Sequence, residues 1–241
     1  MTVGRALTAR DRLMVALDLP TVEEAETMAR RLADSVGFYK IGLQQVFSGG
    51  LALAERLVGE GHKVFLDVKL LDIDNTVAKA VEAIARIGVR LVTVHAYPKA
   101  MRAAVAARAH APLGLLGVTV LTSLNQADFE AAGYAGTISD RVVARARDAM
   151  AIGMDGIVAS ASEIEAIRAA VANELAIVVP GIRPAGADTA DQRRVATPEE
   201  AIRRGADYLV VGRPILEASD PVAAATAIVD EIAAGLEARA A

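Results

Sequence analysis

The sequence contains no cysteine and no tryptophan, and its aromatic residues amount to only 3% of 241 residues. Without cysteine the chain can form neither a disulfide nor a thiolate metal site, and this composition favours a cytoplasmic protein. No apolar run reaches the ~18 residues that a membrane span needs, and residues 1–5 lack the apolar stretch of a signal peptide. We therefore expect no membrane segment and no secretion signal.

The sequence also lacks a strong excess of charge of either sign. Lys and Arg number 26 and Asp and Glu number 30, which gives a formal net charge of -4. The charges are interspersed, so the sequence has no basic stripe of the kind that binds nucleic acid. What the chain has in abundance is aliphatic residues, since hydrophobic residues make up 54%. Its length and composition suit one α/β domain spanning residues 1–241.

Short apolar runs alternate with longer amphipathic or alanine-rich stretches along the whole chain. The predicted strands are 13–17, 38–41, 64–68, 91–94, 113–120, 156–159, 177–179 and 208–211. Helical stretches lie between them, among them 24–33, 52–61, 77–87 and 139–150. Eight such units in this length predict a single (β/α)8 barrel, a TIM barrel. A doubly wound open sheet is the alternative, but the first strand runs into Leu17-Asp18-Leu19-Pro20 without the expected glycine fingerprint.

Charged residues gather where the third predicted strand ends. Asp67 and Lys69 are two residues apart, so on a strand their side chains project to the same face. Asp72 follows in the next loop, and Lys40 ends the preceding strand. A structural ion pair at a strand terminus explains such a cluster as well as a reactive site does.

The other predicted strands also end in polar or glycine residues, and in a barrel these ends share the face that carries the active site. They contribute Asp18, His95, Thr122, Ser123, Pro180, Gly181, Arg183, Gly212 and Arg213. Gly212 and Arg213 predict a phosphate site, because barrels often bind phosphate after the last two strands and the arginine fork matches phosphate oxygens. A rim arginine paired with an acidic neighbour is the alternative. We interpret His95 as a packed residue.

The spacing of histidines and carboxylates does not predict a metal site. The three histidines are scattered and form no HxH or HExxH motif. Asp18, Asp67 and Asp72 are carboxylates of the kind that can hold Mg²⁺. Lys40 and Lys69, however, already place positive charge among them.

Taken together in order, several fragments resemble the orotidine 5'-phosphate decarboxylase family over nearly the whole chain. They are Ala16-Leu17-Asp18, Lys40-Ile41-Gly42, Phe65-Leu66-Asp67-Val68-Lys69-Leu70-Leu71-Asp72-Ile73 with Asn75-Thr76, Leu121-Thr122-Ser123, Pro180-Gly181-Ile182-Arg183-Pro184, Asp191-Gln192, Arg194-Val195-Ala196-Thr197-Pro198 and Val211-Gly212-Arg213-Pro214-Ile215. The DxKxxD core followed by the PGIRP and VGRPI segments is specific. One departure is Asp74, where bacterial members commonly have proline.

The resemblance implies loss of CO2 from orotidine 5'-monophosphate to give UMP, without a metal or another cofactor. It implies that Lys69 protonates C6 and that Asp67 lies beside the departing carboxylate. Lys40 and Asp72 would complete an alternating chain of charges with this pair. All four are expected as catalytic residues.

The same resemblance implies a set of substrate contacts and a homodimer. The expected binding residues are Asp18, Lys40, Asp67, Ile73, Thr76, Thr122, Ser123, Pro180, Arg183, Gln192, Gly212 and Arg213. Asp18 and Lys40 would contact the ribose, and Thr122 or Ser123 the pyrimidine. The phosphate end would include Gln192, carried on a loop at 180–195 that closes over the ligand. Asp72 and Thr76 would reach into the site of the neighbouring subunit.

Two other functions remain open at this stage. A Mg²⁺-dependent sugar-phosphate lyase or decarboxylase, such as hexulose-6-phosphate synthase, shares the DxKxxD motif, but such enzymes resemble one another in a Glu at the second strand, where this chain has Lys40. The second alternative is a barrel that binds a nucleotide or a partner protein without turnover. Such a binder has no need to keep Asp67, Lys69 and Asp72 so close together.

Overall fold

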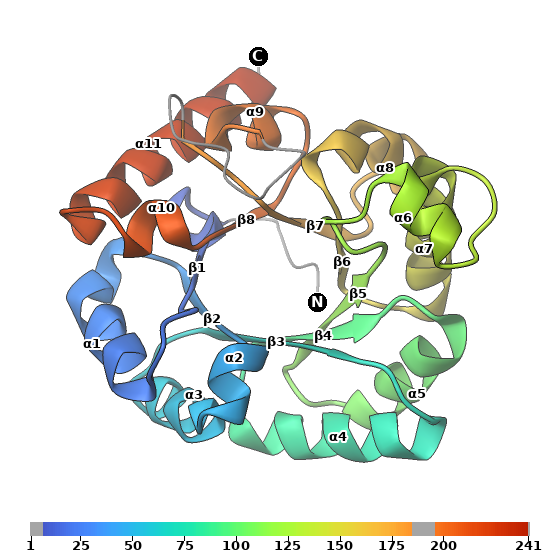
Figure 1. The fold of residues 1–241 in the computed structure, drawn as a ribbon, viewed down its shortest axis with the longest axis horizontal. Helices are drawn as coiled ribbons and strands as arrows, with labels where there is room; N and C mark the ends of the chain where they lie inside the picture. Colours follow the sequence, from blue (N-terminus) through green and yellow to red (C-terminus); the bar gives the residue numbers. More distant parts are fainter. Residues whose placement is uncertain (1–6, 185–195, 241) are drawn as a thin grey trace.

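Eight parallel strands close into a barrel in the computed structural model, which describes residues 7–184 and 196–240. The strand order around the barrel follows the chain, and the last strand pairs with the first (Figure 1). The strands are β1 Leu13–Ala16, β2 Phe38–Gly42, β3 Val64–Leu70, β4 Leu91–His95, β5 Gly114–Val118, β6 Gly156–Val158, β7 Ala176–Pro180 and β8 Tyr208–Val211. The barrel predicted from the sequence is confirmed, with strand ends that differ by at most a few residues.

Helices form the outer ring in Figure 1. They are α1 Val22–Leu32, α2 Leu43–Phe47, α3 Gly50–Gly59, α4 Asp74–Ile87, α5 Pro98–Arg108, α6 Gln126–Ala131, α7 Ile138–Ile152, α8 Ile164–Val171, α9 Pro198–Arg203, α10 Arg213–Leu216 and α11 Pro221–Ala240, with short 3-10 turns η1 Arg10–Arg12, η2 Ala33–Ser35 and η3 Ala161–Glu163. Among these described helices, none is long and apolar enough to cross a membrane.

Local sequence explains where helices such as α1 and α4 begin and end. The hydroxyl of Thr21 accepts the backbone N–H of Glu24, whose side chain in turn accepts the N–H of Thr21. This reciprocal capping box satisfies two backbone donors that a helix start would otherwise leave unpaired. Gly88 ends α4 with a φ of 86°, a left-handed conformation that glycine adopts without a steric penalty.

The barrel interior is filled by apolar side chains, several of which come from the first two residues of their strands. This inner cluster consists of Met14, Ala16, Phe38, Phe65, Leu91, Leu116, Ala176, Val178, Tyr208 and Val210. Its rings pack edge to face, with Phe38 and Tyr208 centroids 5.8 Å apart. Side chains alternate along a strand, so the next inward positions after Phe38, Phe65 and Leu91 lie two residues further on. Those positions hold Lys40, Asp67 and Thr93, and polarity therefore begins toward the carboxyl ends.

The pairing of β3 with β4 is irregular just where this polarity begins. Leu66 pairs with Val92, and the next pair is Leu70 with Val94. Residues 67–69 of β3 therefore face one residue of β4. Extra residues of this kind form a bulge, which bends a strand and re-aims its side chains. The bulge spans residues 67–69, and Lys69 has a φ of 49°.

The segment after β7 returns to the barrel before α9 begins. Ile182 and Ala196 form a parallel bridge, and the N–H of Arg183 donates to the carbonyl of Ala196 at 3.1 Å. Most of the predicted loop at 180–195, including Gln192, lies outside the described residues. Its two bases are therefore joined by backbone contacts.

Candidate active site

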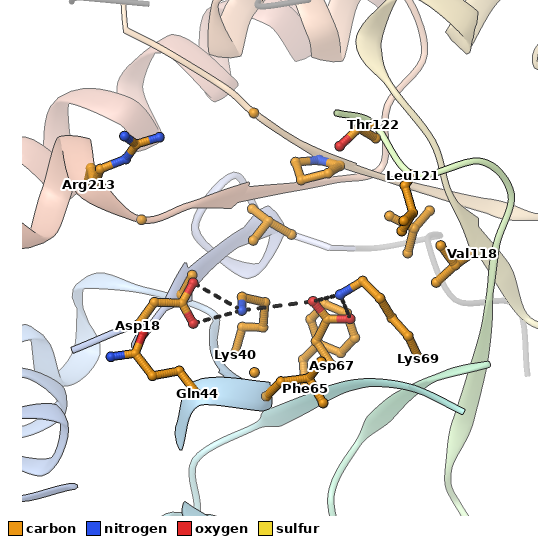
Figure 2. Close-up of a pocket in the computed structure, with 18 of the residues that line it drawn as sticks. Asp18, Lys40, Gln44, Phe65, Asp67, Lys69, Val118, Leu121, Thr122 and Arg213 are labelled. Carbon is orange, nitrogen blue, oxygen red and sulfur yellow. Dashed lines mark hydrogen bonds and ion pairs between the residues drawn. The ribbon is translucent and has the colours of Figure 1, made fainter. Parts of the chain in front are cut away.

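A cavity of about 600 Å³ opens at the carboxyl ends of the strands (Figure 2). Its walls come from loops and strand ends distributed around the barrel. They include nine residues expected from the sequence, namely Asp18, Lys40, Asp67, Lys69, Thr122, Pro180, Arg183, Gly212 and Arg213. The cavity is large enough for a nucleotide-sized ligand.

Four charged side chains form an alternating row across the cavity floor (Figure 2). Lys40 Nζ lies 3.1 Å from Asp18 Oδ1 and 3.9 Å from Asp67 Oδ2. Lys69 Nζ then donates to both oxygens of Asp67, each at 2.8 Å. Lys40 is only 7% exposed. A buried ammonium needs carboxylate partners to offset the loss of hydration, and here it has two.

The bulge in β3 places Asp67 and Lys69 against Thr93. Thr93 is fully buried, and its Oγ1 donates to Asp67 Oδ1 at 2.9 Å. Thr93 Oγ1 also accepts the backbone N–H of Lys69, at 2.8 Å. The left-handed conformation of Lys69 costs about 1 kcal/mol for a residue that carries a Cβ. Backbone strain at a charged cavity residue is typical of functional sites.

Gly42, at the end of β2, leaves room for the first ion pair of the row. A Cβ on Gly42 would stand 2.8 Å from Lys40 Nζ and 3.1 Å from Asp18 Oδ1. Its φ of -100° is open to any residue, so glycine is needed here for space alone.

The opposite side of the cavity offers groups suited to an anion. Arg213 lies across the cavity from the charged row and follows Gly212 at the start of α10 (Figure 2). Arg183 also lines the cavity and is 8% exposed, and its guanidinium donates to the carbonyl of Ile182 at 2.8 Å. Gly181 beside it has a φ of 77°. Arginine side chains among the lining residues suit an anion, because a guanidinium fork matches the oxygens of a phosphate.

Several residues expected at the site do not line this cavity within one chain. Asp72, Thr76 and Ser123 are exposed, and Ile73 is 72% exposed. Asp72 Oδ1 accepts the backbone N–H of Ile73 at 2.6 Å, so the row of charges within one chain ends at Lys69 among the described residues. Gln192, which was also expected at the site, lies outside the described residues.

Asp74, the departure from the family pattern, occupies the first position of α4. Its Oδ2 lies 3.4 Å from Lys99 Nζ. A carboxylate in the first helical turn interacts favourably with the helix dipole, and proline is favoured at the same position because of its fixed φ. Both residues are therefore compatible with this helix start.

His95 lies behind the charged row, at the end of β4. Burial lowers its pKa below the usual 6.5, and the positive charges of Arg145 and Lys69 lower it further. Arg145 is itself buried, lies 4.6 Å from the centroid of the Tyr97 ring and donates to the carbonyl of Thr119. The Tyr97 ring packs edge-on to His95, with centroids 6.3 Å apart. His95 is thus a packed residue, as interpreted from the sequence.

The carboxylates of the cavity are already occupied by ammonium groups. Across residues 7–184 and 196–240 no three His, Cys, Asp or Glu side chains are grouped so that they could hold a metal ion. Lys40 Nζ lies between Asp18 and Asp67, in the position where a cation bridging those carboxylates would sit.

Sequence reasoning missed Thr93 and the spatial role of Gly42. A signal for Thr93 was present, because it lies two residues after the inward-facing Leu91 and two before His95. Inward alternation would have placed it in the same layer as Lys40 and Asp67. No sequence signal marks the contact of Gly42 with Lys40, since that contact depends on the lysine rotamer.

Comparison with known proteins agrees with this geometry. The model of the "Orotidine 5'-phosphate decarboxylase / HUMPS family" matches residues 11–228. Orotidine 5'-phosphate decarboxylase of Methylobacterium sp. (strain 4-46) is 57% identical over 94% of this chain and 98% of its own length. The Rhodopseudomonas palustris (strain CGA009) protein of the same name is 57% identical over 93% of this chain and 95% of its own.

A solved structure supports the same assignment. The crystal structure of orotidine 5'-phosphate decarboxylase from Lactobacillus acidophilus superposes with a TM-score of 0.80 at 33% sequence identity. The match covers 91% of this chain and 98% of that one. With a paired Asp67 and Lys69 on the wall of its barrel cavity, the chain belongs to the orotidine 5'-phosphate decarboxylase family.

Proposed function

We propose that the protein converts orotidine 5'-monophosphate into UMP and CO2 in pyrimidine biosynthesis, with Lys69 as the proton donor and without a metal or another cofactor. The observation that carries this proposal is the Asp67–Lys69 pair, with both oxygens of Asp67 2.8 Å from Lys69 Nζ, on the wall of a nucleotide-sized cavity. The names of the relatives at 57% identity support the choice of substrate.

The reaction requires a stabilised carbanion and a proton. The bond from C6 to the carboxylate breaks, its electron pair stays on C6, and CO2 leaves. An N–H proton of the Lys69 ammonium then moves to C6, and the neutral amine regains a proton from water. Before that transfer the ammonium stabilises the developing negative charge, which is the electrostatic form of catalysis that a fixed, partly buried charge performs well.

Asp67 and Lys40 hold the proton donor in place. Asp67 accepts from Lys69 on one side and approaches Lys40 at 3.9 Å on the other. We assign Asp67 a positioning and electrostatic role beside the departing carboxylate. Lys40, anchored by Asp18, keeps the row of charges ordered.

The remaining cavity residues divide between the ribose, the pyrimidine and the phosphate. We assign Asp18 and Lys40 to ribose hydroxyls and Thr122 to the pyrimidine edge. The phosphate contacts are assigned to Arg183, Gln192, Gly212 and Arg213, next to Pro180. Arg213 lies across the cavity from Lys69 (Figure 2), so a phosphate bound there could orient the base toward the proton donor.

A homodimer would complete the site with Asp72 and Thr76 of a second copy. Leu71 and Ile73, which flank Asp72 in the chain, are exposed within one chain by 51% and 72%, and Phe47 at the end of α2 is exposed by 86%. Apolar groups exposed this far favour burial against a partner. We therefore propose that Asp72 and Thr76, with Ile73, act across the subunit interface.

A direct assay tests the proposed reaction. Purified protein is mixed with orotidine 5'-monophosphate in EDTA, and the loss of ultraviolet absorbance and the formation of UMP are followed. Turnover in EDTA supports a metal-independent decarboxylase. Activity only with added Mg²⁺ and a ketose phosphate would instead assign the protein to the sugar-phosphate lyases and overturn the proposal.

A further inference from the structure

Thr93 is the one residue of β4 that faces the bulge of β3. Between the pairs Leu66–Val92 and Leu70–Val94, the strand β3 has three residues and β4 has one. The regular ladder of backbone hydrogen bonds is interrupted there. There the backbone N–H of Lys69 donates to the side-chain oxygen of Thr93, at 2.8 Å.

The hydrogen-bonding capacity of a hydroxyl fixes the direction of this contact. A threonine hydroxyl has one donor hydrogen and can accept through its oxygen. The backbone N–H of Lys69 can only donate, so it uses an acceptor site on Oγ1. Asp67 as a carboxylate can only accept, so it takes the single hydroxyl hydrogen at 2.9 Å. The buried hydroxyl of Thr93 therefore contacts both members of the reactive pair. It accepts from Lys69 and donates to Asp67.

We infer that Thr93 is a positioning residue for decarboxylation, which holds the Asp67 carboxylate in the rotamer that pairs with Lys69 and holds Lys69 in its left-handed backbone conformation. The inference rests on the proposed function for the identity of the reaction. Thr93 lines no part of the cavity and does not contact substrate, because it is fully buried beneath the pair. Its effect is to fix the distance and angle between donor and carboxylate.

The position in the barrel explains why a side chain is needed for this task. Asp67 Oδ1 receives two donors, Lys69 Nζ at 2.8 Å and Thr93 Oγ1 at 2.9 Å. Without the second donor, nothing from β4 would oppose rotation of the carboxylate toward Lys40, whose Nζ lies 3.9 Å from Oδ2. Small displacements of reacting groups cost large factors in rate.

Replacing the hydroxyl while keeping the shape of the side chain tests this inference. Thr93→Val removes the donor and acceptor but keeps the branched Cβ. We expect kcat to fall by about 10- to 100-fold, the cost of losing a buried hydrogen bond to a charged group. The affinity for UMP, which has no carboxylate at C6, should change by less than about threefold, because Thr93 touches no ligand atom. Thr93→Ser restores the hydroxyl and should return kcat to within about threefold of wild type.

Thr119→Val provides a matched control for the loss of a buried hydroxyl. Thr119 is also fully buried, and its Oγ1 donates to the backbone carbonyl of Val158 at 2.8 Å, away from Asp67 and Lys69. This variant should lose thermal stability to a similar extent and keep kcat within about threefold of wild type. If Thr93→Val does not fold, Thr93→Ala removes the hydroxyl together with the γ-methyl group and leaves no methyl where the hydroxyl stood.

The outcomes separate this inference from the proposed function. A wild-type protein that fails to decarboxylate orotidine 5'-monophosphate overturns the proposed function. An active wild type with an unchanged kcat in Thr93→Val, or with Thr93→Ser as impaired as Thr93→Val, overturns the role of Thr93 alone. A crystal structure of Thr93→Val in which Asp67 and Lys69 keep their positions overturns it whatever the activity.

Discussion

Gly42 lies against the ammonium group of Lys40, so closely that a Cβ at position 42 would stand 2.8 Å from Lys40 Nζ. The atom it meets is the far end of a flexible side chain, which can move away. Moving it breaks the row of charges that begins at Asp18. Glycine at this position therefore preserves the ion pair of Lys40 with Asp18.

Gly42→Ala is expected to lower kcat/KM by about 10- to 100-fold and also to lower the melting temperature, because it displaces the buried Lys40 ammonium from its carboxylate partners. Steady-state kinetics and thermal unfolding measure the two effects. Gly59→Ala is the matched control, since a Cβ there meets nothing within 4 Å at the end of α3. Wild-type kinetics in Gly42→Ala would contradict a role for the Lys40–Asp18 contact.

Lys69→Ala should abolish turnover, with a loss of at least about 10⁴-fold, because it removes both the proton donor and the charge that stabilises the carbanion. The dissociation constant of UMP, measured by titration calorimetry, should change by no more than a few-fold, since we assign the phosphate contacts to other residues, among them Arg213 across the cavity. Lys79→Ala, at an exposed lysine of α4, should match wild type in both measurements. Near-normal turnover in Lys69→Ala would overturn the assignment of the proton donor.

Arg213→Ala should weaken binding of UMP by about 10- to 100-fold, the contribution of hydrogen bonds between charged groups. Binding of uridine, which has no phosphate, should change by less than about twofold. Arg203→Ala removes an exposed arginine that does not line the cavity and should leave both affinities unchanged. Equal losses for nucleotide and nucleoside in Arg213→Ala would rule out the phosphate role.

Mixing two inactive variants tests whether Asp72 acts across a subunit interface. In a hybrid dimer of Lys69→Ala and Asp72→Ala subunits, one site would carry both changes and the other would carry neither. Random reassociation should then restore about one quarter of wild-type activity in a two-fold symmetric dimer. Activity is measured after unfolding and refolding the mixture together. If Asp72 serves its own subunit, every site is impaired and the mixture stays inactive.

The pH dependence of stability should include a contribution from His95. Burial, Arg145 and Lys69 lower its folded-state pKa below 6.5. Below pH 6.5 the unfolded chain therefore binds a proton that the folded protein does not, so this contribution to stability is fully present above pH 6.5 and is lost as pH falls toward the folded-state pKa. The slope can reach about 1.4 kcal/mol per pH unit.

Urea unfolding at pH 7.5 and at pH 5 measures this effect. The difference in the free energy of unfolding between the two values should be smaller in His95→Gln than in wild type. His110→Gln makes the same change at an exposed side chain and should keep the wild-type difference. An identical pH dependence in wild type and His95→Gln would show that burial of His95 does not shift its titration.

The sequence was sufficient to predict the barrel and most of the cavity, because both follow from periodic patterns. Apolar runs repeated eight times, and the polar residues that followed them met at one face. Asp67 and Lys69 were expected to meet through simple alternation, and they do meet. The route is different, since a bulge and a left-handed Lys69 intervene, and alternation carries no information about either.

Other parts of the site depend on tertiary contacts that local sequence does not encode. Gly42 reads as an ordinary residue at a strand end until the position of Lys40 Nζ is known. The roles proposed for Asp72 and Thr76 would need a second chain, because both residues are exposed in one. Ser123 is exposed as well, so Thr122 is the member of that pair which lines the cavity.

The bridge between Ile182 and Ala196 has a consequence for how this barrel can change over generations. It joins the end of β7 to the start of α9 through backbone contacts of Ile182 and Arg183 with Ala196. Lengthening a loop whose ends are already joined costs little conformational entropy. Insertions between Ile182 and Ala196 can therefore accumulate over generations at a small entropic cost to the barrel.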